Sequence, residues 1–441
     1  MSVRRLRTVS QVLISIIVLA AMLGCSSSNG STADKTAKDQ EVKLKFIWWG
    51  KDQRKQDTLK VIALYEKQHP NVHIMTEDYS VNNDVATQLA METADQATPD
   101  IIQGDYSFIF DYINRDLIEP LNPYIKNKTL STSDIAKSTL LPGMKGDELF
   151  ALNIGMNSEA LLYDPEFFQE AGLAVPSMDY TIDELHTLLT QLKETVDTPD
   201  FYPLGNMFNA NYYLRTRGAS MFNAAGTNLG YDDDTILSDY LSLYKQWYDE
   251  GLIKPDSYQD IPVDESHPVI SRQSAFYFGF SNNVAALSKL AGHTIKLLPL
   301  PVITEDGEGR FIKPSMFLAV SSYSKYPEEA VKFLDFFVNN AEANDILQGE
   351  RGIPVSKVIS AKLSAKADET GKQQLELINY LNTHSAPIDA PAPGNSIVVS
   401  NSFLLILKHV VEGSITPEQG AKFYRSEATG ILQGSGTEGE K

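Results

Sequence analysis

The spacing of apolar and polar residues in the first part of the chain predicts alternating strands and helices. Residues 42–49 read VKLKFIWW, which alternates and then becomes wholly apolar, as expected of a strand that enters a core. The same reasoning predicts strands at 72–75 and 99–103, with helices at 58–69 and 85–95 between the strands. This β-α-β-α-β order is typical of a parallel sheet covered by helices.

Helix-capping residues mark further helices later in the chain. A side-chain oxygen before the first turn accepts hydrogen bonds from free backbone N–H groups, and proline suits the first helical position because its missing N–H is not needed there. Gly172 suits a helix end, since glycine readily adopts the left-handed backbone conformation common there. The helix starts are Asp164–Pro165, Thr181–Glu184, Pro327–Glu328 and Thr416–Gln419. The continued alternation predicts an α/β fold.

Composition narrows the class of protein. The chain has 441 residues, 42% of them hydrophobic, which predicts two or three domains with a substantial core and excludes a disordered chain. It carries 38 Lys and Arg against 57 Asp and Glu, a net charge of −19. This acidic balance argues against nucleic acid as a partner, because phosphate binding needs clustered cations. A single cysteine excludes an intramolecular disulfide and a Cys-rich zinc site.

That single cysteine lies at the end of a predicted export signal. Residues 1–24 combine three arginines with an apolar run too short to span a bilayer as a helix, which needs ~20 residues. Gly24-Cys25 resembles a lipobox, where the chain is cut before the cysteine and the sulfur receives a lipid. We expect residues 1–24 to be a signal peptide and 25–41 a lipidated cysteine with a flexible tether, on the extracytoplasmic face of the cell membrane. The alternative is an uncleaved anchor with an incidental cysteine.

Motifs spread over the mature chain occur in the order of one known family. They are Trp48-Trp49-Gly50 with Arg54, TPDIIQ at 98–103, LFALNIGMN at 149–157, LLYDPEFF at 161–168, and the stretch 313–340 followed by RGIPV at 351–355. In this order, and together with the lipobox, they resemble the extracellular solute-binding proteins of bacterial ABC importers. The resemblance is to the branch that includes the maltose and multiple-sugar binding proteins.

The resemblance implies a two-lobed α/β fold of the periplasmic-binding-protein type (type II), with a ligand cleft between the lobes. The lobes would close around the ligand by a hinge motion. The implied function is that of a monomeric, lipid-anchored protein that captures an oligosaccharide and delivers it to an ABC permease without catalysis. The implied boundaries are 42–153 plus 299–347 for one lobe, 154–298 plus 348–430 for the other, and 431–441 for a polar tail.

Aromatic and cationic residues near a strand end are the first candidates for the ligand site. Flat aromatic rings stack on sugar rings, and Trp48 and Trp49 end the first strand on opposite faces of the sheet, so at most one enters the cleft directly. Trp49 is favoured because it is nearer the strand end; the alternative is that both pack in the core. Arg54 stands where the family pattern places a ligand-side arginine, and its planar group can make a two-pronged contact.

Further candidates lie in loops after strands and at positions matched by the resemblance. Asp105 and Tyr106 follow a predicted strand, where functional side chains often lie, and a carboxylate can accept hydrogen bonds from two hydroxyls. The segment 206–217, rich in Asn, Tyr and Arg, has the composition of a saccharide-binding loop or of a polar helix surface. The resemblance adds Phe280, where many members carry Trp, Met316 before a first-lobe strand, and Arg351 before the Gly-Ile-Pro turn.

The chain carries no recognisable catalytic or metal-binding motif. It lacks the G-x-S-x-G, H-E-x-x-H and P-loop patterns, and Asp232–Asp234 lacks the following Gly and Glu of a calcium loop, so we expect no cofactor and no metal. Three alternatives stay open. The first is the same fold with a uronate, a polyol or another polar solute as ligand, where Arg54 would favour an anionic group. The second is a secreted glycosidase with a carboxylate pair. The third is a cell-surface sensor or adhesion partner without transport.

Overall fold

The structure, a computed structural model of the whole chain, describes residues 41–94, 98–255, 261–305 and 307–434. The described helices and strands lie within residues 42–432. The predicted signal peptide, Cys25 and all of the tether except Glu41 lie outside the described residues. In the ranges given above, no helix is long and apolar enough to cross a membrane.

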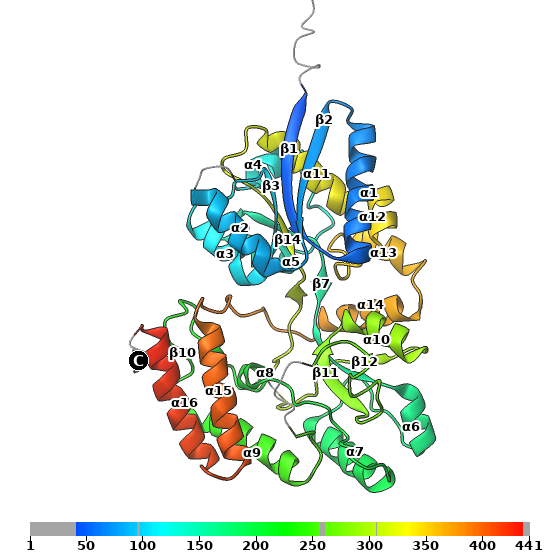
Figure 1. Cartoon of the computed structure of the whole chain (residues 1–441), viewed down its shortest axis with the longest axis vertical. Coiled ribbons are helices and arrows are strands. Elements are labelled where there is room, and N and C mark those ends of the chain that lie inside the picture. The colour runs from blue at the N-terminus through cyan, green and yellow to red at the C-terminus, as the bar shows by residue number, and fades with distance from the viewer. Residues whose placement is uncertain (1–40, 95–97, 256–260, 306, 435–441) are drawn as a thin grey trace, which may run out of the picture. The chain divides into compact units, whose positions relative to one another are not determined.

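The first lobe is built on a five-stranded sheet in the order β2-β1-β3-β14-β6 (Figure 1). β1 (Val42–Trp49) pairs in parallel with β2 (Val72–Tyr79) and β3 (Ile101–Gly104), which confirms the predicted β-α-β-α-β unit. β14 (Phe317–Val320) runs antiparallel to β3 and to β6 (Ala151–Asn153). The sheet is therefore mixed, and the expected parallel pairing holds only for the strands that are linked by α1 and α2.

Helices pack on this sheet, and both predicted ones, α1 and α2, begin earlier than the sequence indicates. α1 (Asp52–Gln68) begins before the predicted start at Thr58. Its first residues are polar and mostly exposed, so no apolar spacing in the sequence marks them as helical. α2 (Asn82–Ala94) follows β2. The other elements of this lobe are α3 (Tyr106–Asn114), α4 (Asn122–Lys126), α5 (Lys137–Leu140), η1 (Leu141–Gly143), β4 (Met144–Lys145), β5 (Glu148–Leu149), α11 (Pro327–Asn339), α12 (Ala341–Leu347) and α13 (Lys357–Ser364).

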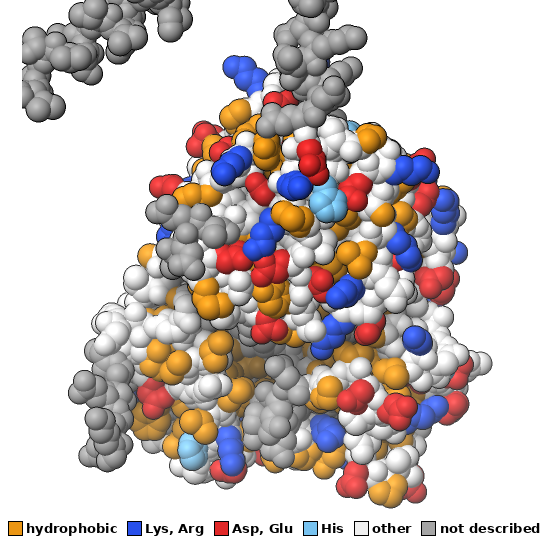
Figure 2. All heavy atoms as spheres, turned by 45° about the horizontal axis from the view of Figure 1, so that its top comes forward, with side chains coloured by type: hydrophobic (Ala, Val, Ile, Leu, Met, Phe, Trp, Pro, Cys, Tyr) orange, Lys and Arg blue, Asp and Glu red, His pale blue; other side chains and the backbone are white. Residues whose placement is uncertain are grey.

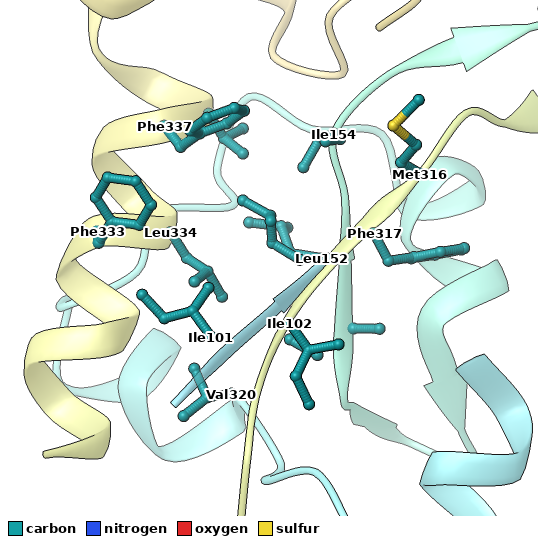
Figure 3. Close-up of a cluster of buried hydrophobic side chains, with 14 of the residues drawn as sticks. Ile101, Ile102, Leu152, Ile154, Met316, Phe317, Val320, Phe333, Leu334 and Phe337 are labelled. Carbon is teal, nitrogen blue, oxygen red and sulfur yellow. The ribbon is translucent and has the colours of Figure 1, made fainter. Parts of the chain in front are cut away.

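Part of the core of the first lobe lies between α11 and the sheet (Figure 3). Phe333, Leu334 and Phe337 recur on one side of α11, as helical spacing requires, and are almost fully buried against the sheet. Phe317 lies on the side of β14 away from α11. Because Phe317 pairs with both Gly104 and Asn153, the ends of β3 and β6 meet at one edge of the sheet.

The second lobe has a three-stranded antiparallel sheet in the order β11-β8-β12, surrounded by helices. β8 (Glu159–Tyr163) lies between β11 (Phe276–Phe280) and β12 (Lys296–Leu298). The remaining elements are α6 (Pro165–Ala171), α7 (Ile182–Thr195), α8 (Ala210–Arg215), β9 (Ser220–Phe222), β10 (Leu229–Gly230), α9 (Asp234–Asp249), α10 (Asn283–Ala291), α14 (Glu369–Leu381), α15 (Ser396–Val411) and α16 (Pro417–Leu432).

The predicted helix caps of this lobe are confirmed. Asp164 accepts a hydrogen bond from the backbone N–H of Glu166, and Gly172 ends α6 in the left-handed conformation. Thr181 and Thr416 each form a reciprocal capping box with the residue three positions on. Local signals of this kind depend on a few neighbouring residues, so the sequence alone is enough to find them.

Two short paired strands join the lobes. β7 (Met156–Asn157) pairs antiparallel with β13 (Lys313–Pro314), and Met156 also bridges to Ile353. The backbones approach so closely here that a Cβ on Gly155 would lie 2.4 Å from the carbonyl oxygen of Arg351. Glycine is therefore needed at this crossing, where any change in the angle between the lobes has to be absorbed.

Two stretches of the chain pack in the hydrophobic core of a different lobe from the one expected. Leu300 packs in the core of the second lobe, whereas Ile353 and Val355 pack in the core of the first. We therefore propose that residues 299–311 belong to the second lobe and 348–366 to the first. The expected polar tail also begins too early, because α16 continues to Leu432, whose side chain is buried; residues 435–441 lie outside the described part of the chain.

Candidate ligand-binding cleft

A cleft of about 1020 Å³ lies between the two lobes. Its first-lobe wall is made mainly by α3 and the segment from α5 to η1, and its second-lobe wall by residues 224–226 and the segment after α14. The lining residues are Tyr106, Ser107, Phe108, Phe110, Asp111, Asn114, Ser138, Thr139, Leu141, Pro142, Asn153, Ala224–Gly226, Ile312, Pro314, Asn382, Ser385–Ile388 and Ala390–Gly394.

The helix α3 supplies the aromatic wall of the cleft. Asp105 caps this helix by accepting a hydrogen bond of 2.9 Å from the backbone N–H of Ser107. The side of α3 that carries Ile109 and Ile113 is buried in the first lobe. The half-buried rings of Tyr106, Phe108 and Phe110 line the cleft instead. The cap and the buried side thus fix which rings can meet a ligand.

The cleft contains little charge. Acidic and basic side chains are interspersed over the face drawn in Figure 2. Among the lining residues, all of which the structure describes, Asp111 is the single charged one. The other polar side chains that line the cleft carry amides and hydroxyls, such as those of Asn114, Asn153 and Thr139. These groups hydrogen-bond neutral hydroxyls and offer no cation to an anionic ligand.

An extended segment, Ser385–Gly394, forms the second-lobe wall opposite α3, and we call it the strap. It has the sequence SAPIDAPAPG and connects α14 to α15 (Figure 1). The hydroxyl of Tyr106 donates a hydrogen bond of 2.7 Å to the backbone carbonyl oxygen of Asp389. Burial, and more weakly Asp389, raise the pKa of Tyr106 to about 12, so the phenol keeps its proton at neutral pH.

The two tryptophans at the end of β1 are both buried. Trp48 has no exposed surface and packs near Phe46 in the core, which leaves no face for a ligand in this structure. Trp49 is 7% exposed, and its ring centroid lies 6.5 Å from that of Phe108. Of this pair, Phe108 is the ring that lines the cleft. Direct contact of Trp49 with a ligand stays a prediction.

The two predicted arginines share one carboxylate partner and are absent from the cleft lining. Glu350 accepts hydrogen bonds from both Arg54 and Arg351. Arg351 also donates to Gln103 at 3.2 Å and to the hydroxyl of Thr58 at 2.7 Å. Burial lowers the pKa of Arg351 to about 10, with nearby Arg54 adding to the effect and Glu350 opposing it. These contacts hold the first lobe together, and a ligand role for either arginine stays a prediction.

Comparison with known proteins decides the family. The profile of the family described as bacterial extracellular solute-binding protein matches residues 51–344. This chain belongs to that family. The resemblance to this family noted in the sequence is thereby confirmed at the level of the family. The protein is a solute-binding protein of the ABC-transporter type, a class that delivers its ligand to permease components, and its two-lobed α/β fold matches that of solved solute-binding proteins.

Solved structures extend the comparison to nearly the whole chain. An extracellular solute-binding protein family 1 structure from Alicyclobacillus acidocaldarius is 29% identical, with a TM-score of 0.77 over 89% of this chain and 99% of that one. A periplasmic oligogalacturonide binding protein from Yersinia enterocolitica, in complex with saturated digalacturonic acid, is 20% identical, with a TM-score of 0.73 over 90% of this chain and 100% of that one. The second likeness concerns the fold alone.

A curated relative matches part of the chain. An uncharacterised ABC transporter extracellular-binding protein of Pyrococcus horikoshii is 24% identical over 191 residues, which are 42% of this chain and 42% of that relative. The match therefore spans less than half the length of that protein.

Two other predicted site residues of this solute-binding protein, Met316 and Phe280, are not among the residues that line the cleft. Met316 is 7% exposed and belongs to the first-lobe core. Phe280 is 37% exposed, pairs with Glu159 across β11 and β8, and lies under the ammonium group of Lys313 at 4.7 Å. Burial raises the pKa of the Glu159 carboxyl, while a hydrogen bond from Asn209 and the charge of Lys313 oppose the shift.

Sequence reasoning did not identify Arg215 and Asp389 individually. The segment 206–217 contains the short helix α8 (Ala210–Arg215), whose last residue, Arg215, is buried and pairs with the carboxylate of Asp389. Asn211 donates to the other carboxylate oxygen at 2.9 Å. Asp389 stands between prolines and alanines with no periodic pattern around it, so its neighbours gave no signal.

A second cavity of about 540 Å³ lies in the second lobe of this solute-binding protein, beside the strap. Most of its wall is aromatic or aliphatic, and α9 and α15 contribute Tyr240, Phe403 and Leu407 to it. Ala390 and Ala392 line both this cavity and the cleft. Across the described residues, no cluster of three or more His, Cys, Asp or Glu is placed to hold a metal ion, and Asp233 instead caps α9.

Proposed function

We propose that this solute-binding protein captures a neutral oligosaccharide in the cleft between its lobes and delivers it to an ABC permease. The lining of the cleft carries the proposal. Three rings from α3 offer flat apolar faces, and the amides and hydroxyls around them match sugar hydroxyls. A volume of about 1020 Å³ has room for more than one sugar ring, since ordinary small-molecule pockets span roughly 300–1,000 Å³.

The charge of the cleft favours a neutral ligand over a uronate. Arg54, which would favour an anionic group, is engaged by Glu350 and is absent from the cleft lining. The lining residues, all described, include no Lys or Arg. A carboxylate moved into this site would lose its hydration without gaining a cation, and a nearby Asp111 would repel it. We therefore infer a ligand different from that of the oligogalacturonide-binding neighbour.

The same lining argues against a glycosidase. Hydrolysis of a glycosidic bond uses two carboxyl groups about 5–9 Å apart. Asp111 is the single acid among the described lining residues, so the cleft offers no carboxyl pair. This agrees with membership of a family of binding proteins rather than enzymes.

We also propose that the protein is held at the extracytoplasmic face of the membrane by a lipid on Cys25. The support is the basic, apolar and small-residue pattern of residues 1–25. Replacing Cys25 with Ser should release the protein from membranes into the soluble fraction after cell fractionation. Continued membrane retention of the Cys25→Ser variant would contradict the lipid anchor without touching the ligand proposal.

A thermal-shift screen tests the ligand proposal. The panel contains neutral di- to tetrasaccharides of glucose, mannose and galactose, together with matched uronic-acid oligomers. A ligand at 100 times its dissociation constant stabilises the folded protein by about 2.7 kcal/mol, which is readily detected. At least one neutral member should raise the melting temperature, and the uronic-acid oligomers should have a smaller effect. Stabilisation by uronic-acid oligomers alone, or turnover of a hit into smaller sugars, would contradict the proposal.

A further inference from the structure

The strap, Ser385–Gly394, is held in place with little help from packing. None of its ten residues, all of them described, is buried. The strap lines the cleft, and Ala390 and Ala392 of the strap also line the second cavity. This part of the strap therefore separates the cleft from the second cavity. Pro387, Pro391 and Pro393 restrict the backbone and remove N–H donors. A stiff segment of this kind needs anchors to define its position.

Asp389, near the middle of the strap, provides the main anchor. One carboxylate oxygen accepts from the Arg215 guanidinium, and the other accepts from the Asn211 amide at 2.9 Å. Arg215 also donates to the backbone carbonyl oxygen of Pro387 at 2.8 Å. The strap is thus gripped at two positions by side chains of the single helix α8.

Arg215 is itself rigidly placed. Its side chain is 5% exposed, its Nε donates to the carbonyl oxygen of Gly309 at 2.8 Å, and its guanidinium lies 5.0 Å from the ring centroid of Phe311. The planar guanidinium therefore contacts the strap on one side and residues 309–311 on the other. Lysine has one ammonium group in place of this fork and cannot reproduce all of these contacts.

The first lobe reaches the same anchor. The hydroxyl of Tyr106 donates to the carbonyl oxygen of Asp389 at 2.7 Å, and the Tyr106 ring stacks near Phe317 at the edge of the first-lobe sheet. One hydrogen bond therefore connects the aromatic wall of the cleft to the strap wall. Opening of the cleft along this line requires that bond to break.

We propose that Arg215 and Asp389 are positioning residues that set the second-lobe wall of the cleft, and that the Tyr106–Asp389 hydrogen bond is a latch between the lobes. The inference rests on the proposed function for its meaning in sugar binding, because the strap is the surface that would face a ligand held against α3. The position of the strap itself does not depend on which solute binds. Loss of Arg215 or Asp389 frees the strap, whereas loss of the Tyr106 hydroxyl frees the lobes while the strap stays in place.

A nitroxide label on the strap tests the positioning role without any ligand. The full chain carrying Cys25→Ser has no other cysteine, so Ala390→Cys can be labelled alone. Arg215→Lys and Asp389→Ala should each remove the immobilised component of the label's spectrum. Arg425→Lys is the matched control, since Arg425 makes a comparable pair with Asp234 and a contact with the Tyr231 ring in the same lobe, and the immobilised component should persist in it.

Two results would overturn the positioning role. One is an immobilised label that persists in both Arg215→Lys and Asp389→Ala. The other is an equal loss of that component in Arg425→Lys, which would mean that general loosening of the lobe is responsible. Because Asp389 is half-exposed, Asp389→Ala keeps the test decisive if Arg215→Lys lowers the melting temperature so far that it cannot be measured.

Distance measurements between the lobes test the latch. In the Cys25→Ser chain, labels at Lys126→Cys in the first lobe and Glu194→Cys in the second report the separation of the lobes by pulsed electron spin resonance. Without ligand, Tyr106→Phe should broaden the distance distribution toward longer values. Tyr112→Phe, on the same helix, should leave it unchanged. An unchanged distribution in Tyr106→Phe would overturn the latch, whatever ligand the cleft proves to bind.

Discussion

The hydroxyl of Tyr106 lies 2.7 Å from the carbonyl oxygen of Asp389 and joins the two walls of the cleft. Tyr106 begins α3 in the first lobe, while Asp389 is gripped by the second-lobe residues Arg215 and Asn211. Tyr106 also lines the cleft, so one side chain both meets the space for a ligand and holds the lobes together. Ligand binding and lobe closure can therefore be linked through this residue.

Phe108 is expected to contribute directly to ligand affinity. Its half-buried ring lines the cleft in the middle of the aromatic wall of α3. Phe108→Ala should weaken binding of a neutral oligosaccharide by about 1–3 kcal/mol, as for other losses of an aromatic stacking partner. Calorimetric titration measures the change, and Phe423→Ala, at an exposed position on α16, serves as the control. Equal affinities of Phe108→Ala and the wild type would remove this ring from the site.

Trp49 is expected to act mainly through stability. Its ring is 7% exposed and packs against Phe108, so truncation leaves a cavity behind the aromatic wall. Trp49→Ala should lower the free energy of unfolding by about 3–5 kcal/mol, measured by urea denaturation. Trp49→Phe, which keeps a ring in the core, should lose less. A Trp49→Ala variant with wild-type stability and lost binding would instead support direct ligand contact.

A new cation in the cleft should change ligand preference. Asn114 is exposed in the lining of the cleft, on the last turn of α3. Asn114→Arg should increase affinity for a uronic-acid oligomer, since an arginine can pair with its carboxylate. Asn71→Arg, in the exposed turn before β2, adds the same charge elsewhere and should have no such effect. A gain that is equal in both variants would point to net charge rather than to the cleft.

His267 should make the protein less stable in acid. The ring has no exposed surface, and burial lowers its pKa from 6.5 to about 4, with Asp264 opposing the shift. The unfolded chain therefore binds a proton that the folded chain does not, and stability falls as the pH drops from about 6.5 to about 4. The loss approaches roughly 3 kcal/mol at the acid end. Above pH 6.5 this contribution is constant.

Urea denaturation at pH 7 and at pH 4 measures the effect of His267. His267→Phe should lose less stability between the two pH values than the wild type does. His409→Gln, at an exposed position on α15, should follow the wild type. Identical pH dependence of His267→Phe and the wild type would show that other groups account for the acid sensitivity.

The parts of the fold that follow from local physics could be predicted from the sequence. The alternation at 42–49 and the caps at Asp164 and Thr181 involve neighbouring residues, and each lies where the pattern places it. The start of α1 was missed because its first residues are polar, and the antiparallel direction of β14 depends on how the chain returns from the second lobe.

The candidate site was harder to predict because it depends on distant pairs. The sequence placed Trp49 and Tyr106 at strand ends. In the structure only Tyr106 of these two lines the cleft, because the Trp49 ring packs against Phe108. Arg215 and Asp389 are separated by 174 positions, and nothing near either residue indicates its partner. Such contacts arise from tertiary packing and have no signature in local spacing.

The central claim is that the cleft selects neutral oligosaccharides. Isothermal titration of the wild-type protein with the best neutral oligosaccharide of the screen, and with the uronic-acid oligomer of the same length and linkage, tests it most directly. Asp111 is the single charged residue among the described residues of the lining. We therefore expect saturable binding of the neutral sugar, and binding of its uronic-acid counterpart that is weaker by roughly tenfold or more, a difference of at least about 1.4 kcal/mol. Equal or tighter binding of the uronic-acid oligomer would contradict the claim.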